Sequence, residues 1–238
     1  MKKILACMRK AVSDYNMIQK GDKIAVGVSG GKDSLTLLLV LNRLREFLPE
    51  SFEVTAVCLT LGFDNEDISP LENLCKEKGI PFIKKETLIG KIIFDVRNEK
   101  NPCSLCANLR RGALHNTAVE LGCNKVALGH HLDDVIETFF LSLLYEGRIN
   151  TFEPVTYLSR KNLHLIRPLV YMPEFEIKSF IRKNNIQIVE NPCPANCKTS
   201  RQFVKDLIQN LCTKDPIIKT RVFGAIKRHF PQWDITNL

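Results

Sequence analysis

The sequence contains no hydrophobic run of membrane-spanning length, no internal repeat and no low-complexity segment. The segment Met1–Lys10 also lacks the apolar centre of a secretory signal. We therefore expect a cytoplasmic protein with no membrane partner. No linker-like stretch divides the 238 residues. This predicts one domain over residues 1–238, with a short N-terminal helix (about 1–20) and C-terminal helices (about 199–228) packed on it.

The sequence also lacks the pattern of a disulfide-stabilised secreted protein. Its nine cysteines are an odd number in a chain without a secretion signal, so we expect no stable disulfides in a reducing compartment. Four cysteines lie in apolar or helical contexts and are predicted to be buried small residues, namely Cys58, Cys75, Cys123 and Cys212. Two closely spaced pairs beside proline are different: Cys103 with Cys106, and Cys193 with Cys197.

The charge of the chain is basic, with 34 lysines and arginines against 26 acidic residues and a formal net charge of +8. Basic residues cluster at 110–111, 198–205 and 219–228. Such an excess is compatible with a nucleic-acid partner, but solvated helix faces explain it equally well. The charge alone therefore leaves RNA binding open.

Strand-like and helix-like segments alternate along the chain. Strands are expected at about 23–28, 53–60, 80–83 and 125–129, with an extended piece at 166–169. Helices are expected at about 5–20, 34–47, 69–79, 106–121, 132–146, 173–184, 199–211 and 215–228. The alternation predicts an α/β fold: a mainly parallel sheet with helices on both faces and a C-terminal helical segment. Ligands of such sheets bind beyond the carboxyl ends of the strands.

A glycine turn follows the first predicted strand and precedes a helix, with the sequence Ser29-Gly30-Gly31-Lys32-Asp33-Ser34. A turn of this kind directs backbone N–H groups and a helix N-terminus at one place, which suits a phosphate. The two serines add hydroxyl donors, the lysine adds positive charge, and the aspartate can share Mg²⁺ with phosphate oxygens. The common phosphate loop and the dinucleotide fingerprint are both absent. The alternative is an ordinary glycine-rich turn.

A second turn, Gly129-His130-His131, stands between a predicted strand and a helix that begins with Asp133 and Asp134. With Glu137, these residues place three carboxylates within one turn, a set that suits a magnesium site or a base near ATP. Simple helix capping is the alternative for the two aspartates. The histidines are candidates for contact with ATP or a nucleobase, and equally for the core.

The paired cysteines indicate a metal site. Cys103 and Cys106 can bring two thiolates onto one metal, and Cys193 or Cys197 can add a third or fourth ligand. Four thiolates suit zinc or a fully ligated iron–sulfur cluster, whereas three leave one iron with an open position. Spacing alone does not decide between zinc and a cluster. Nearby arginines can hold a phosphate of ATP or of RNA, namely Arg110 and Arg111.

These motifs together resemble the tRNA 2-thiocytidine synthetases, which belong to the pyrophosphate-loop ATPases. The resemblance spans nearly the whole chain and is carried by residues 8–18, 21–22, 29–34, 103–106, 109–112, 128–134, 167–169, 192–193 and 201–202. It implies an adenine nucleotide α-hydrolase-like fold and ATP-dependent sulfur transfer to the 2-oxo group of an anticodon-loop cytidine in tRNA. It also implies a [4Fe-4S] cluster, Mg²⁺, a homodimer and a cysteine desulfurase or other sulfide donor.

On this resemblance the candidate cluster ligands are Cys103, Cys106 and Cys193. The family often has Cys-x-x-Cys at the last position, whereas this chain has Cys-x-x-x-Cys, so Cys197 is an alternative third ligand. The ATP-binding residues expected are Ser29, Gly30, Gly31, Lys32, Asp33, Ser34, Gly129 and His130. Asp134, Asp33 and Arg110 are expected to be catalytic. A basic surface for tRNA is expected from Arg110, Arg111, Lys198, Arg201 and Lys205.

Three other functions remain open. A tRNA lysidine synthetase would share the glycine turn but needs no metal-binding cysteines. A related thiolase could act on another tRNA base. A zinc-stabilised RNA-binding module without catalysis would explain the charge and the cysteines, but it would leave both strand-end motifs without a role.

Overall fold

The computed structural model describes residues 2–63, 66–96, 102–189, 193 and 200–235 of the chain. Within these residues six strands form one sheet in the order β3-β2-β1-β4-β6-β5. The strands are β1 (Lys23–Gly27), β2 (Glu53–Leu59), β3 (Phe82–Lys85), β4 (Lys125–Ala127), β5 (Val155–Leu158) and β6 (Leu163–Ile166). All pairs are parallel except that of β5 with β6. The mainly parallel sheet is thus confirmed.

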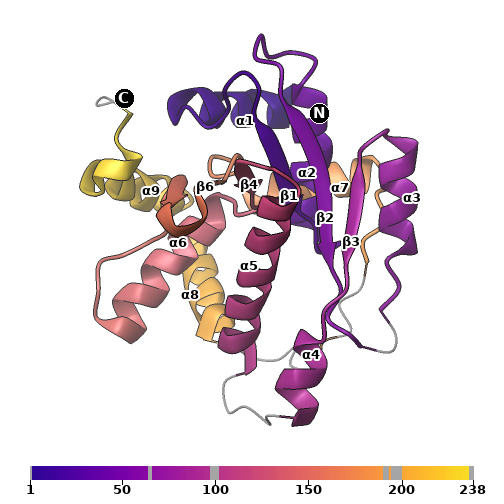
Figure 1. Cartoon of the computed structure of the whole chain (residues 1–238). Coiled ribbons are helices and arrows are strands. Elements are labelled where there is room, and N and C mark those ends of the chain that lie inside the picture. The colour runs from indigo at the N-terminus through magenta and orange to yellow at the C-terminus, as the bar shows by residue number, and fades with distance from the viewer. Residues whose placement is uncertain (1, 64–65, 97–101, 190–192, 194–199, 236–238) are drawn as a thin grey trace.

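Helices cover both faces of the sheet (Figure 1). The α-helices are α1 (Lys2–Asp14), α2 (Lys32–Leu44), α3 (Ser69–Glu77), α4 (Ile89–Lys91), α5 (Pro102–Glu120), α6 (Leu132–Leu141), α7 (Glu174–Lys183), α8 (Ser200–Lys214) and α9 (Ile218–His229). Helix α5 packs on one face, whereas α1, α2 and α7 lie together on the other (Figure 1). Helices α8 and α9 pack against α6, which confirms the C-terminal helical segment.

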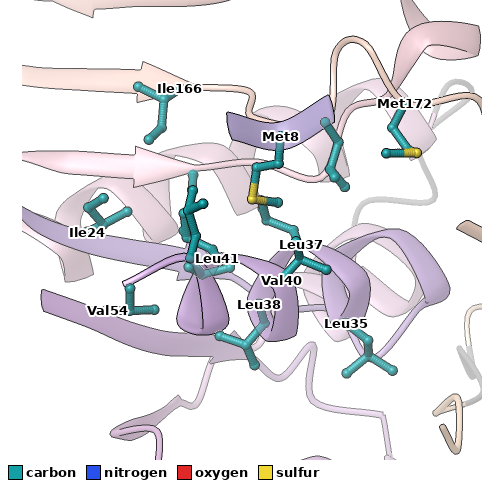
Figure 2. Packing of buried hydrophobic residues seen from close by; sticks show 14 of the residues in the cluster. Met8, Ile24, Leu35, Leu37, Leu38, Val40, Leu41, Val54, Ile166 and Met172 are labelled. Carbon is teal, nitrogen blue, oxygen red and sulfur yellow. The ribbon is translucent and has the colours of Figure 1, made fainter. Parts of the chain in front are cut away.

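The alternation of side chains along β1 divides the core between the two faces. Ile24 and Val26 belong to the larger cluster, which includes α1, α2 and α7. Ala25 points to the opposite face, where it packs with Leu114 and other residues of α5. Figure 2 shows the larger cluster, in which Leu37 of α2 is fully buried. Because β1 is covered on both sides, its carboxyl end is held rigidly, and the glycine turn begins there.

Several boundaries differ from the sequence-based prediction. The N-terminal helix ends at Asp14 rather than near residue 20. The last parallel strand is β6, at 163–166 rather than 166–169, since Pro168 has no N–H to donate. The antiparallel strand β5 and helix α4, with the π-helical turn Ile92–Val96 after it, were not predicted.

Two longer helices also differ in detail. The helix expected at 132–146 is α6 followed by a π-helical turn, Ser142–Glu146. The helix expected at 106–121 begins four residues earlier, so that α5 contains both Cys103 and Cys106. The buried state predicted for three other cysteines is confirmed, whereas Cys212 is only half-buried. No helix among the described residues is long and apolar enough to cross a membrane.

Candidate active site

The glycine turn after β1 leaves the start of α2 open to an anion. Gly31 is the residue that precedes α2, and no side chain caps the helix at this end. The first N–H groups of a helix have no partner within it, so here they can bind a phosphate. The serines shape the turn instead: the Ser29 N–H donates to Ser34 Oγ over 3.2 Å, and Ser34 Oγ donates to the Gly31 carbonyl over 3.0 Å.

The N-terminus of α6, at the second turn, is closed by the protein itself. The Asp134 N–H donates to His131 Nδ1, and the His131 N–H donates to the Asp134 carboxylate over 3.0 Å. Asp133 accepts the N–H of Glu174 over 2.7 Å and pairs with Lys219 at 2.6 Å. The capping interpretation therefore holds for Asp134, and Asp133 joins α6 to α7 and α9. Of the two strand-end motifs, only the glycine turn offers an open helix N-terminus.

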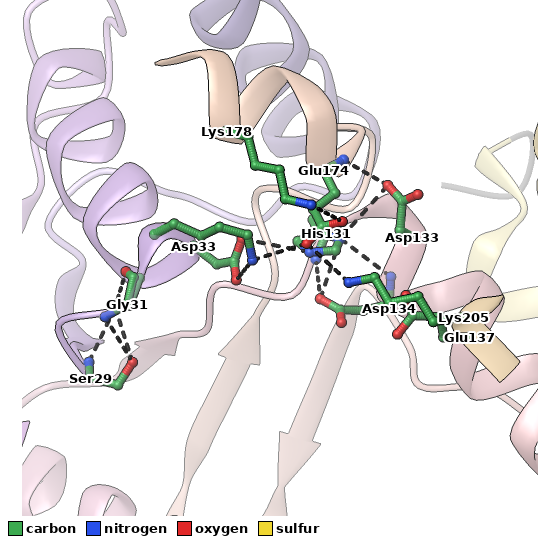
Figure 3. A network of polar contacts seen from close by, with 12 residues as sticks. Ser29, Gly31, Asp33, His131, Asp133, Asp134, Glu137, Glu174, Lys178 and Lys205 are labelled. Atoms are coloured by element: carbon green, nitrogen blue, oxygen red, sulfur yellow. Dashed lines mark hydrogen bonds and ion pairs between the residues drawn. The ribbon is translucent and has the colours of Figure 1, made fainter. Parts of the chain in front are cut away.

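Charged side chains surround the glycine turn in one network (Figure 3). Lys32 Nζ lies 2.8 Å from Asp33 Oδ2 and 3.1 Å from Glu174 Oε1. Burial opposes the charge on Lys32, but its hydrogen bonds with Asp33 and Glu174 outweigh this and raise its pKa. Among the described residues the second carboxylate oxygen of Asp33, Oδ1, is buried without a hydrogen-bond partner, and His131 Nε2 lies 3.6 Å from it. An unpartnered carboxylate oxygen beside a phosphate site suits a divalent cation that keeps most of its water.

A cavity of about 710 Å³ opens at the carboxyl ends of β1, β2, β4 and β6, where ligands of parallel sheets bind. It is lined by residues from both strand-end motifs and from α5, among them Ser29, Asp33, Ser34, Gly129, His130, Asp134, Arg110, Arg111 and Arg201. Gly129 must be glycine in this packing, because a Cβ would lie 3.0 Å from the Asp33 carbonyl carbon. The two motifs expected from the sequence therefore share one cavity.

Val189, four residues before Cys193, lies against the glycine turn. The Val189 N–H donates to the Gly30 carbonyl over 3.1 Å. A Cβ on Gly30, whose φ is +76°, would lie 2.5 Å from the Val189 Cβ. This close approach explains why the turn needs glycine here. It also anchors the chain at the glycine turn only four residues before Cys193, which no sequence signal indicated.

The pKa of the Cys106 thiol is affected by the other two candidate ligands. Burial raises the pKa of Cys106, the Arg110 charge opposes this, and charges on Cys193 and Cys103 raise it further. Arg110 also forms a hydrogen bond with the Cys106 side chain. The three thiols are thus close enough to affect one another electrostatically, and the arginine that acts on Cys106 lines the cavity. Nevertheless, no three potential ligands stand at metal-binding distances in the described part of the chain.

One wall of the cavity joins β4 and β6 through aromatic and cationic side chains. The His130 ring centroid lies 4.9 Å from that of Phe152, and the Arg167 guanidinium carbon lies 5.1 Å from the same Phe152 centroid. Burial lowers the pKa of His130 to about 4, with the Arg167 charge as the next cause. Burial also lowers the pKa of Arg167, to about 10. His130 is therefore neutral at pH 7 and Arg167 is charged.

Of the basic residues expected to bind tRNA, some line the cavity and others do not. Arg110 and Arg111 line the cavity, as does Arg201, which also pairs with Glu137 at 3.3 Å. Lys205 lies outside this cavity and pairs with Glu174 at 3.1 Å. Lys198 and the alternative ligand Cys197 lie outside the described residues.

Sequence reasoning gave no role to four residues at this site: Phe152, Arg167, Glu174 and Val189. Arg167 belongs to a motif that carried the family resemblance, but its contact with Phe152 depends on β5, which was not predicted. Glu174 begins a predicted helix, a position that alone signals only helix capping.

A family model, curated relatives and a solved structure all relate this chain to the same group of proteins. The PP-loop domain family matches residues 2–211. A tRNA-cytidine(32) 2-sulfurtransferase of Syntrophotalea carbinolica is 37% identical, with 94% of this chain and 88% of that protein covered. The same enzyme of Geobacter sulfurreducens is 37% identical, with coverage of 98% and 91%. Among solved structures, the U34-tRNA thiolase NcsA of Methanococcus maripaludis, with its [4Fe-4S] cluster, has a TM-score of 0.77 at 25% identity and coverage of 94% and 78%.

Proposed function

Since the chain belongs to the PP-loop domain family and, within it, to the tRNA-cytidine(32) 2-sulfurtransferases, we propose that its cavity activates a tRNA cytidine with ATP and replaces the 2-oxo group by sulfur. ATP-dependent tRNA thiolation is the activity of this family. The single observation that carries the assignment to this site is the shared cavity: the glycine turn and the Cys106–Arg110 helix face the same space. The target is the 2-oxo group of an anticodon-loop cytidine.

The glycine turn binds ATP. The open N–H groups at the start of α2 receive the phosphates, with Lys32 and the hydroxyls of Ser29 and Ser34 beside them. Gly31 leaves room for the phosphates at the turn, since a Cβ there would meet only Ser29 Oγ, and Gly129 lets the second turn pack against the start of α2. Asp33, through its unpartnered Oδ1, would hold a Mg²⁺ ion that offsets charge on the departing pyrophosphate.

The chemistry has two balanced steps. First, the cytosine O2 attacks the α-phosphorus of ATP, and the bond to pyrophosphate breaks. Second, a hydrosulfide forms a bond to C2, the bond from C2 to oxygen breaks, and AMP leaves with that oxygen. The proton of the hydrosulfide goes to the Asp134 carboxylate, which lines the cavity. Arg110 stabilises the negative charge on the leaving AMP.

The donor set of the cysteines fits an iron–sulfur cluster. Cys103, Cys106 and Cys193 would hold it, since charges on Cys103 and Cys193 act on Cys106, which also interacts with Arg110. A [4Fe-4S] cluster with three thiolate ligands would supply one iron at which sulfide can bind. The Val189–Gly30 hydrogen bond, four residues before Cys193, supports a cluster position near the glycine turn.

The tRNA contacts the mouth of the cavity. Arg110, Arg111 and Arg201 offer positive charge there for the RNA backbone. The target base has to leave its stack in the loop in order to reach the cavity. A cysteine desulfurase or other sulfide donor and assembly as a homodimer complete the proposal. The protein acts in the cytoplasm, where its tRNA substrate is found.

The test separates the two steps. With an anticodon stem-loop substrate, Asp33→Asn should abolish release of pyrophosphate and AMP, whereas its iron content stays normal. Cys106→Ala should lose iron and 2-thiocytidine, detected by mass spectrometry of the digested RNA, but should keep ATP binding. Cys7→Ala in α1 is the matched control and should change neither. An active Cys106→Ala protein, or wild-type protein that thiolates RNA with zinc and without iron, would refute the proposal.

A second candidate is favoured by the likeness to NcsA, which is described as a U34-tRNA thiolase. The chain would then act on a uridine rather than a cytidine. Stem-loops that carry either base as the only candidate target distinguish the two possibilities.

A further inference from the structure

The cavity has two ends that differ in chemistry, with the glycine turn between them. At the β2 end the walls are apolar and include Val57, Leu59 and Ala107. At the β6 end they carry His130, Phe152 and Arg167. The reaction brings two planar rings into this cavity, the adenine of ATP and the base that is modified. The two ends differ in what they can recognise, so each ring should prefer one of them.

The β6 end has polar groups that no atom of the described residues satisfies. Within that part of the chain, His130 Nδ1 and Arg167 Nε are both buried without a hydrogen-bond partner. Arg167 Nη1 is already fixed by the Glu153 carbonyl at 2.6 Å and by Thr156 Oγ1 at 3.1 Å. Buried polar groups without partners cost free energy, so each calls for an explanation. A ligand that supplies one donor and adjacent acceptors would satisfy them.

The Watson–Crick edge of cytosine has this pattern. It presents the N4 amino group as a donor, followed by N3 and O2 as acceptors. The neutral imidazole of His130 offers one acceptor nitrogen. The χ2 torsion of a histidine has broad, roughly two-fold minima, so the ring can turn to present that nitrogen to a ligand. The guanidinium of Arg167 is a donor only. Uracil, in contrast, would present its N3–H to the Arg167 donors and would leave both without a partner.

From these contacts we propose that His130, Phe152 and Arg167 form the site that binds the target base and selects cytosine over uracil. The base ring packs against Phe152, whose own orientation is fixed by His130 and Arg167. His130 accepts from N4, and Arg167 donates to N3 and O2. The inference rests on the proposed thiolation and deepens it. It also moves His130 from the ATP site, where the sequence placed it, to the site of the base.

The position of the wall supports this assignment over adenine. Arg167 lines the same cavity as Arg111, which is exposed at its mouth, where the RNA backbone would pass. The adjacent N3 and O2 acceptors of cytosine also match the fork of a guanidinium, whereas adenine has C2–H at the corresponding place. Adenine is left with the apolar β2 end.

The first experiment measures base selectivity. Single-turnover thiolation is followed with two anticodon stem-loops that differ only in cytidine or uridine at the target position. Arg167→Gln replaces a pure donor with an amide that can also accept the uracil N3–H. We expect the preference for cytidine over uridine, as a ratio of kcat/KM values, to fall at least about tenfold. An unchanged preference in a folded Arg167→Gln protein would overturn the proposal.

The second experiment avoids the buried arginine. Phe152→Leu keeps an apolar side chain of similar size but removes the ring, so the rate of thiolation at saturating RNA should fall about 5- to 150-fold. ATP affinity by calorimetry and stem-loop affinity should change less than about twofold, because phosphates supply most of the RNA affinity. Phe82→Leu in β3, outside the cavity, is the matched control and should behave as wild type.

The outcomes separate the two proposals. If Phe152→Leu weakens ATP binding and leaves the chemical step unchanged, the wall binds adenine, and the base assignment is wrong. If wild-type protein thiolates neither stem-loop in the presence of ATP and sulfide, the proposed function itself fails. If wild-type protein thiolates cytidine and both variants keep wild-type rates and selectivity, only the base site is refuted.

Discussion

The ammonium group of Lys32, in the glycine turn, lies 3.1 Å from a carboxylate oxygen of Glu174, the first residue of α7. The same carboxylate accepts hydrogen bonds from Lys205 of α8 and Lys178 of α7. Glu174 therefore joins the start of α2 to the C-terminal helices. Burial alone would raise its pKa, but the hydrogen bonds from Lys178, Lys205 and Lys32 lower it to about 2.

Removal of this carboxylate charge should destabilise the protein. Glu174→Gln keeps the size of the side chain but loses its charge-assisted hydrogen bonds, so the free energy of unfolding at pH 7 should fall by about 1.5–3 kcal/mol. Urea denaturation followed by circular dichroism measures this change. Glu77→Gln is the control, because Glu77 pairs with Lys78 on an exposed surface, and it should change stability by less than about 0.5 kcal/mol. Equal losses in the two variants would contradict the prediction.

The same group should make stability depend on acid pH. The pKa of Glu174 is lower in the folded protein than its ordinary value of 4.5, so the unfolded chain binds the proton more tightly. Its stabilising contribution is therefore complete above pH 4.5 and is lost as the pH falls toward about 2. Glu174→Gln should show a smaller loss of unfolding free energy across this range than wild-type protein. Parallel curves for the two proteins would show that Glu174 is not the group responsible.

Gly30 should tolerate no side chain, in contrast to its neighbour. Gly30→Ala puts a Cβ at a φ of +76° and 2.5 Å from the Val189 Cβ, which should lower the free energy of unfolding by about 1–3 kcal/mol. Gly31 has a φ of −75°, and a Cβ there would meet only Ser29 Oγ, at 3.5 Å. Gly31→Ala should therefore change stability by less than about 0.5 kcal/mol. Thermal unfolding without nucleotide compares the two variants.

The positions of the two strand-end motifs could be predicted from the order of strands and helices along the chain. The alternation of apolar strands and amphipathic helices predicted a parallel sheet, and parallel strands bring their carboxyl ends to one edge. Ser29 and Gly129 therefore meet at one cavity, although 100 positions separate them in the chain. The requirement for glycine at 30 and 129 is only partly local: the φ of Gly30 is +76°, but the atoms that a Cβ would meet belong to Val189 and to Asp33, which lie far away in the chain.

Contacts between distant segments were not predictable in the same way. Val189 crosses the glycine turn through one backbone hydrogen bond, and a backbone contact leaves no mark on side-chain type. Phe152 reaches the cavity because β5 turns back antiparallel beside β6, and β5 is a short, half-exposed edge strand with a weak pattern. The role of Glu174 depends on its ion pairs with lysines of three different helices, and the sequence does not show that these helices meet.

Arg110 should control the reactivity of Cys106. Burial raises the pKa of this half-buried thiol, and the charge and hydrogen bond of Arg110 oppose that rise, so Arg110→Leu should reduce the thiolate fraction. In metal-free protein at pH 8, alkylation of Cys106 by iodoacetamide should slow by about 2- to 10-fold. Mass spectrometry of the peptide that contains Cys106 gives the rate. Arg111→Leu, one residue further along α5, is the control and should have a smaller effect; equal slowing would mean that only general charge matters.

Arg111 should contribute to RNA affinity through phosphate contact. It is exposed and lines the cavity mouth, so Arg111→Ala should weaken binding of target and non-target stem-loops alike. The slope of log affinity against log salt concentration should fall in magnitude by about 1, as expected for the loss of one phosphate contact. Fluorescence anisotropy at several salt concentrations measures the slope.

The control for this slope is a cation at the opposite edge of the sheet. Lys20 is exposed and precedes β1, so it lies at the amino end of the strands, away from the cavity. Lys20→Ala removes the same charge from the chain, and its slope should equal that of wild-type protein. If both variants lower the slope equally, RNA responds to the net charge of +8 rather than to the cavity mouth. If neither does, the RNA backbone passes elsewhere, because a phosphate contact always releases counterions.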